Sequence, residues 1–171
     1  MVSNAARWLK RRHLLRIAMA PLVAAMGLAV APAVYADEPL NGNGTDTISF
    51  SPVVEHTADG NTFIDYTFSE TETGIFDGTR VGSGELVIHA DGTLNTQNDG
   101  VFTGTVAGRS GTAEMDFWGS GTFAAAGGSF TVSHGTGGLD GVHAQGTDFG
   151  FATGPTSFVA TYSFKVNFSA P

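Results

Sequence analysis

From Ile48 onward, short stretches of alternating apolar and polar residues are separated by turn residues, and this pattern most restricts what the chain can fold into. No stretch repeats its apolar residues at the 3.6-residue period of a helix over three turns. The segment 62–72 alternates clearly, and one face of a strand there would carry Ile64, Tyr66, Phe68 and Glu70. Turn dipeptides such as Asp91-Gly92 separate one stretch from the next. The described pattern predicts an all-β protein.

The spacing of these stretches predicts about eight to ten antiparallel strands in a single domain. An eight-stranded closed β-barrel is the favoured architecture, with a two-sheet β-sandwich as the alternative. Pro52 interrupts the first stretch and is expected at a sheet edge or a bulge. Asp77-Gly78 is expected to be a turn, and Asp99-Gly100 is expected to break a strand. The predicted strands are 48–54, 62–72, 80–89, 93–97, 101–106, 112–118, 121–124, 130–134, 142–151 and 158–168.

The beginning of the chain has the features of a secretory signal peptide. Five basic residues precede an apolar run from Ile17 to Val30, and Val34-Tyr35-Ala36 supplies small residues at a cleavage site. We therefore expect residues 1–36 to be a signal peptide cut after Ala36, residues 37–46 a flexible leader, and residues 47–171 the barrel domain. The expected location is extracellular.

The charge of the exported part excludes two classes of partner. After Ala36 the chain has 16 acidic residues against three basic ones, Arg80, Arg109 and Lys165, which is a formal net charge of −13. Such a protein repels nucleic-acid phosphates and anionic membrane surfaces, so neither partner is expected. The chain has no cysteine, so its stability depends on the sheet and the core instead of disulfides.

The segment from Val132 to Thr147 reads VSHGTGGLDGVHAQGT and joins two predicted strands through a glycine-rich turn. Gly135, Gly137 and Gly138 allow the chain to reverse, and Leu139 is expected to fold back as an apolar plug under the turn. This block resembles the strand–turn–strand segment of the allene-oxide-cyclase and dirigent-type barrels, and that of uncharacterised secreted bacterial proteins with the same barrel.

The resemblance implies an eight-stranded barrel with a cavity open at one end. Relatives of this kind use the cavity for cofactor-free cyclisation or for steering a coupling reaction. They are often trimers, so a homotrimer is an expectation by resemblance. No catalytic residue is assigned from the resemblance, because a shared fold does not establish shared chemistry.

Two tyrosines and one expected ion pair are the first candidates for a ligand site inside the barrel. Tyr66 and Tyr162 fall on inward-facing positions, where each hydroxyl needs a hydrogen-bond partner. Glu70 follows on the face of Tyr66, either as an acid or base with a raised pKa or as a solvated residue at the rim. Arg80 is expected to pair with Glu70 or Glu72 across a hairpin. The favoured role of Arg80 is structural, and a clamp on a ligand carboxylate is the alternative.

Trp118 and His134 complete the candidate set. Trp118 shares a strand face with Glu114 and Asp116. The alternation favours that face outside the barrel, whereas the opposite register would place two carboxylates in the cavity. His134 ends an inward-facing series that begins at Phe130, just before the glycine turn.

Motifs for metal or nucleophile chemistry do not emerge from the sequence. His89, His134 and His143 lie on separate predicted strands, and no Gly-x-Ser-x-Gly elbow introduces a serine nucleophile. Neither a cofactor nor a metal is expected.

Three functions remain open from the sequence. The first is the binding of a small apolar molecule, and the second is a cofactor-independent cyclase or isomerase. Both require a pocket near a few hundred Å3, as is common for ligand sites. The third is a structural or surface-interaction protein with a filled barrel.

Overall fold

A computed structural model describes residues 38–169. The predicted signal peptide lies outside the described residues. Within residues 38–169, no helix is long and apolar enough to cross a membrane.

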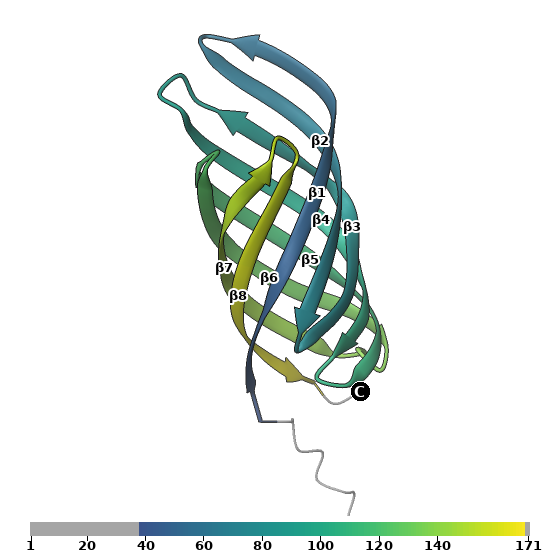
Figure 1. Cartoon of the computed structure of the whole chain (residues 1–171). Coiled ribbons are helices and arrows are strands. Elements are labelled where there is room, and N and C mark those ends of the chain that lie inside the picture. The colour runs from purple at the N-terminus through teal and green to yellow at the C-terminus, as the bar shows by residue number, and fades with distance from the viewer. Residues whose placement is uncertain (1–37, 170–171) are drawn as a thin grey trace, which may run out of the picture. The chain divides into compact units, whose positions relative to one another are not determined.

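Eight antiparallel strands form one closed barrel in which each strand pairs with its sequence neighbours and β1 pairs with β8 (Figure 1). This confirms the predicted barrel, and the sandwich alternative is wrong. The strands are β1 (Leu40–Ala58), β2 (Asn61–Gly74), β3 (Phe76–Ile88), β4 (Thr93–Val106), β5 (Arg109–Thr122), β6 (Ala125–Gly137), β7 (Val142–Gly154) and β8 (Ser157–Phe168).

Barrel closure corrects the predicted leader. β1 begins at Leu40, and residues 40–46 pair with Val166 to Ala160 of β8. The polar composition of this segment resembles a leader, yet its backbone hydrogen bonds are satisfied by a strand that is distant in the sequence. The expected flexible leader over 37–46 is therefore wrong from Leu40 onward.

Other strand boundaries also differ from the prediction because glycines lie inside strands. Asp77-Gly78 belongs to β3, and the chain turns earlier, around Gly74. β4 continues through Asp99-Gly100, and β5 continues to Thr122. Each of these segments has strand partners on both sides, which replace the turn that the local sequence favours.

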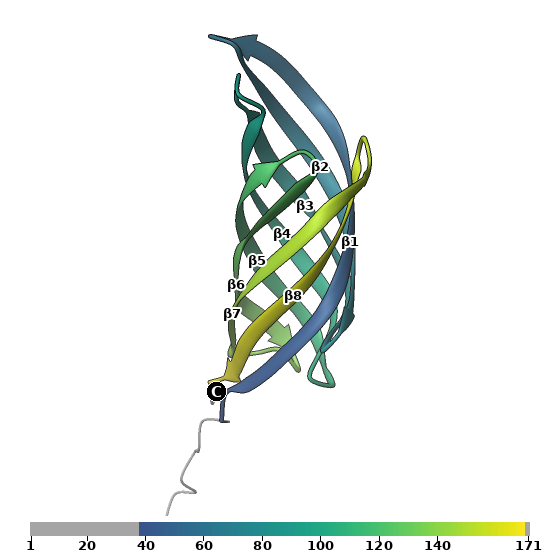
Figure 2. The ribbon, with the colours of Figure 1, turned by 60° about the vertical axis from the view of Figure 1, so that its left-hand side comes forward.

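The β1–β2 hairpin extends beyond the turns of its neighbours, as Figures 1 and 2 show. β1 pairs with β8 only as far as Ser49, while its pairing with β2 continues to Ala58. The register shifts between Pro52 and Val54, which confirms the predicted bulge at this proline.

The half of the barrel next to the β2–β3, β4–β5 and β6–β7 turns is filled with apolar side chains. We call this half the closed end. Phe76 and Phe102 meet edge to face with 5.4 Å between ring centroids. The large side chains that are completely buried all belong to this region: Phe76, Phe102, Val106, Leu139, Val142 and Val166.

The glycine-rich turn between β6 and β7 covers the closed end. Gly137 and Gly141 adopt φ values of 64° and 73°, which glycine accepts without the steric penalty of a side chain. Leu139, between them, has no exposed surface and packs into the closed-end core. The plug predicted for Leu139 is confirmed.

We predict that Leu139→Ala lowers the free energy of unfolding by about 2–5 kcal/mol, because it leaves a cavity under the turn. Urea unfolding monitored by circular dichroism would measure the change. Leu40→Ala is the matched control, because Leu40 is 46% exposed at the start of β1, and its expected cost is below about 0.5 kcal/mol. Equal losses in the two variants would contradict the role of Leu139 as a plug.

Candidate functional site

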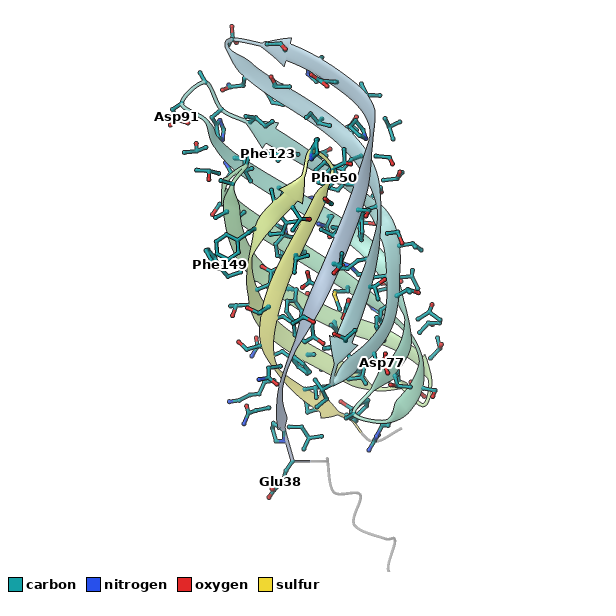
Figure 3. The ribbon with its side chains drawn as sticks, viewed as in Figure 1. Glu38, Phe50, Asp77, Asp91, Phe123 and Phe149 are labelled. Atoms are coloured by element: carbon teal, nitrogen blue, oxygen red, sulfur yellow. The ribbon has the colours of Figure 1, made fainter. Side chains whose placement is uncertain are left out.

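A cavity of about 120 Å3 occupies the other half of the barrel. It reaches the surface beside the β5–β6 and β7–β8 turns, where Phe123 and Ser157 line it, and we call this half the open end. Phe50 and Phe123 lie at this end in Figure 3, and Asp77 lies at the other. The apolar wall of the cavity includes Ile48, Phe50, Leu86, Leu94, Phe117 and Phe158.

Polar and charged side chains form the inner end of the same cavity. They are contributed by five strands and comprise Asp46, Glu70, Arg80, Asn98 and Asp148. On β1, Asp46 lies deeper than Ile48 and Phe50, and on β3, Arg80 lies deeper than Leu86. We call these five residues together with Glu72 the acidic floor, since Glu72 lines a small void of about 20 Å3 directly beneath.

Arg80 and Glu70 form a buried ion pair at the centre of the floor. They face each other in the β2–β3 register, with 2.7 Å between Arg80 Nε and Glu70 Oε2. Their side chains are only 4% and 10% exposed. The guanidinium also lies 4.7 Å from the ring centre of Phe68, which favours a cation. The predicted ion pair is confirmed, and the solvated rim position considered for Glu70 is wrong.

A chain of hydrogen bonds leads from this ion pair toward the open end. Arg80 Nη2 donates to Asn98 Oδ1 at 2.8 Å, and Asn98 Nδ2 donates to the Tyr66 hydroxyl at 3.2 Å. The Tyr66 hydroxyl lies 2.8 Å from Thr96 Oγ1, which in turn donates to the carbonyl of Glu85 at 3.0 Å. Since Thr96 uses its proton on that carbonyl, Tyr66 is the donor to Thr96. The donor and the acceptor of each hydrogen bond in this series are therefore fixed. The series holds the side chains of Asn98 and Arg80 in place.

Three further carboxyl groups have no such cationic partner. Asp46 lies directly opposite Glu72 in the β1–β2 register, and both side chains are buried. Asp148 enters the floor from β7. Glu72 Oε1 and Asp148 Oδ1 are buried without a hydrogen-bond partner, as is Arg80 Nη1. Like charges on directly opposed positions destabilise a sheet, so this arrangement has a cost that the fold must offset.

The protonation of these carboxyl groups reflects that cost. Burial, and next the negative charge of Glu70, raise the pKa of Asp46 to about 7 and that of Glu72 to about 8. The same two causes raise the pKa of Asp148 to about 6. Near neutral pH, Glu72 is therefore mostly protonated, Asp46 is divided between its two forms, and Asp148 is mostly ionised.

Four of the six predicted site residues face the barrel interior. Tyr66, Glu70 and Arg80 line the main cavity. Tyr162 lines the small void beneath it, and its hydroxyl lies 3.0 Å from the carbonyl of Thr73 and 3.2 Å from that of Phe76. The hydroxyl of Tyr162 is thus satisfied by backbone.

Trp118 and His134 do not belong to the site. Trp118 is 47% exposed on the outer face of β5, as the favoured alternation predicted. The expected inward position of His134 is wrong, because the β5–β6 register shifts next to it and its φ is 51°. This irregularity turns His134 outward, where its Nδ1 lies 2.9 Å from Glu114 Oε2 on the surface.

The sequence does not predict Asp46, Asn98 or Asp148 as part of the floor, and it names Glu72 only as an alternative partner of Arg80. Asp46 lies in the segment predicted as a leader, which hides its strand position. Glu72 and Asp148 continue the inward alternation of their strands, from Glu70 and from Ala144 respectively, and that signal was present in the sequence. Asn98 adjoins Asp99-Gly100, where the local sequence predicts a strand break.

Among residues 38–169, no three histidine, aspartate or glutamate side chains are placed to hold one metal ion. The floor therefore offers carboxyl groups to a ligand or a proton.

Comparison with known proteins supports the fold alone. No protein-family profile and no curated protein sequence matches the chain. The chain is similar to the crystal structure of a protein with unknown function from the DUF3224 family of Shewanella oneidensis MR-1, with a TM-score of 0.63 and 17% sequence identity. The similarity covers 78% of this chain and 100% of that one. The resemblance to allene-oxide-cyclase and dirigent-type barrels stays a prediction.

We predict that the free energy of unfolding decreases as the pH rises from about 4 to about 8. Asp46, Glu72 and Asp148 bind protons more tightly in the folded than in the unfolded protein, so their stabilising contribution is complete at acid pH and is lost as each group ionises. Asp46→Asn should reduce the slope of the free energy of unfolding against pH by up to about 1.4 kcal/mol per pH unit. Urea unfolding between pH 4 and pH 8.5 measures it.

Asp99→Asn is the control for this prediction, because Asp99 is exposed on the adjacent position to Asn98 in β4. Its pH dependence should match that of the unchanged protein. If neither Asp46→Asn nor Asp99→Asn changes the slope of the free energy of unfolding against pH, the burial argument for Asp46 is wrong.

Proposed function

We propose that this protein is an exported binding protein that holds a small, mostly apolar molecule in the cavity at the open end. The observation that supports the proposal is the division of this cavity into an apolar wall and a polar inner end. An apolar wall with a few convergent polar groups is the usual composition of a small-molecule site. The signal-peptide pattern before Ala36 supports export.

The size of the cavity restricts the ligand. Its volume of about 120 Å3 does not meet the few hundred Å3 required above for a typical ligand site, so the proposal holds only for a much smaller ligand. An engineered apolar cavity of about 150 Å3 binds benzene. The enclosed part of the ligand is therefore no larger than about one six-membered ring, and any further part would extend through the open end.

We predict saturable binding of a neutral ring compound, such as cyclohexylmethanol, followed by two-dimensional NMR of the labelled protein. The largest shift changes should occur at residues that line the cavity. Ala126→Phe should abolish binding, because Ala126 lines the cavity and a phenyl ring would fill much of it.

Ala124→Phe is the matched control, because Ala124 is exposed in the β5–β6 turn and does not line the cavity. This variant should bind as the unchanged protein does. The absence of saturable binding, or binding that survives Ala126→Phe, would disprove the proposed site.

The raised pKa values favour a second candidate function, a cofactor-independent isomerase. Asp148 is mostly ionised near neutral pH and can accept a proton, while Asp46 is partly protonated and can donate one. Two carboxyl groups whose pKa values differ within one cavity are a common acid–base arrangement. The resemblance to allene-oxide cyclases supports the same class of chemistry.

The isomerase candidate predicts that the protein accelerates the exchange of the α-protons of cyclohexanone in D2O. Asp148→Asn should remove the acceleration, since its side chain no longer accepts the proton as a base. Proton NMR follows the loss of signal with time. A ring ketone that binds without accelerated exchange would leave binding as the function and exclude this activity toward ketones.

A further inference from the structure

The acidic floor contains more negative than positive groups, and its one cation is already engaged. Arg80 is the cation, and it donates through Nε to Glu70 and through Nη2 to Asn98. Asp46, Glu72 and Asp148 remain without a cationic hydrogen-bond partner among the described contacts of the floor. A ligand that enters the cavity thus meets excess negative charge at its inner end.

Buried oxygen atoms without a hydrogen-bond partner also favour a ligand that donates hydrogen bonds. Glu72 is only 4% exposed and lines the void beneath the cavity, and its Oε1 has no hydrogen-bond partner. Asp148 as a residue is half-buried, but its Oδ1 atom is likewise buried without a hydrogen-bond partner. Asp148 also lines the main cavity, so a donor group of a ligand there would remove the free-energy cost of its unpartnered acceptor.

An anionic ligand fits this site less well. Arg80 Nη1 is an unpartnered donor and would attract an anion. The anion would, however, approach Asp46, Glu70 and Asp148, which line the same end of the cavity. A metal ion is also disfavoured, since the described carboxylate and imidazole groups are not grouped to hold one.

We propose that the ligand is a small protonated amine, whose ring or short chain occupies the apolar wall and whose ammonium group binds at the acidic inner end of the cavity, which Asp46, Glu70 and Asp148 line. An ammonium group carries three donors and no acceptor, which complements a floor rich in carboxylate oxygens. This inference rests on the proposed binding function and specifies the chemistry of the ligand.

The proposal has a pH dependence that follows from the groups facing the floor. β5 and β6 contribute the uncharged Met115, Phe117 and Phe130. The titratable or charged groups come from five other strands: Asp46 on β1, Glu70 and Glu72 on β2, Arg80 on β3, Asp148 on β7 and Tyr162 on β8.

Between pH 5 and pH 8.5, ionisation of Asp46, Glu72 and Asp148 makes the floor more negative. An aliphatic amine stays protonated over this range, like a lysine side chain with a pKa of about 10.4. Amine affinity therefore rises with pH.

The test compares three compounds of equal size by isothermal titration calorimetry at pH 5 and pH 8.5. They are cyclohexylmethylamine, cyclohexylmethanol and cyclohexanecarboxylate. At pH 8.5 the amine should bind on the order of tenfold more tightly than the alcohol, and the carboxylate should bind most weakly. At pH 5 the advantage of the amine over the alcohol should shrink to about twofold or less.

Variants connect the preference to the floor. Asp46→Asn should reduce the amine-to-alcohol affinity ratio at pH 8.5, and Glu72→Gln should reduce it as well. Asp99→Asn, which changes an exposed carboxylate instead, should leave the ratio unchanged. Ala126→Phe should abolish binding of both compounds. Amine binding that persists in Ala126→Phe would occur elsewhere and would overturn the proposal.

The outcomes separate this inference from the function on which it rests. If the alcohol binds in the cavity as tightly as the amine, or the carboxylate binds most tightly, the ammonium proposal is wrong while the binding function stands. If none of the three compounds binds, both are wrong. If Asp46→Asn and Glu72→Gln leave the amine-to-alcohol affinity ratio at pH 8.5 unchanged, the floor does not bind the ammonium group and the proposal is wrong.

Discussion

Closure of the sheet through the pairing of β1 with β8 is the constraint on which the rest of this structure depends. This pairing satisfies the backbone of residues 40–49 and encloses a single interior. Every second side chain of each strand must then share that interior with those of seven other strands. Charged residues that alternate into this space have no access to bulk water on their own strand, so they must find partners across the barrel.

The enclosed space is divided along the barrel by the kind of side chain that each strand contributes. Aromatic and aliphatic groups fill the closed end around Phe76 and Phe102. At mid-barrel the inward positions are occupied by the acidic floor, where Arg80 is the cation that balances part of its charge. Beyond it, apolar residues surround space instead of filling it, and the cavity results. The barrel is therefore solid at one end and hollow at the other.

The acidic floor destabilises the folded state of a protein that has no disulfides to offset the loss. Asp46 opposite Glu72, with unpartnered oxygens on Glu72 and Asp148, would be avoided in a core that serves stability alone. Groups of this kind are concentrated at functional sites, where a ligand or a reacting group completes them. The structural similarity to a protein of unknown function supports the fold and gives no chemistry. Within this protein, the cavity and its floor carry the groups that could bind or react.

The sequence by itself determined the class of the fold and much of its interior. Period-two alternation is a local property, and it predicted strands and the inward positions of Tyr66 and Tyr162. It also predicted an ion pair of Arg80 with Glu70 or Glu72 across one hairpin. The glycines before Leu139 likewise predicted a turn with an apolar plug, although of Gly135, Gly137 and Gly138 only Gly137 has a positive φ.

Only the tertiary structure decided which acids meet. Asp46, Glu72 and Asp148 come from β1, β2 and β7, and their proximity depends on the register of a closed sheet, which strand alternation does not specify. The same reason explains two errors: pairing with β8 extends β1 into the predicted leader, and a shift in the β5–β6 register turns His134 outward. Local pattern states which face a residue occupies, whereas long-range pairing decides what lies opposite.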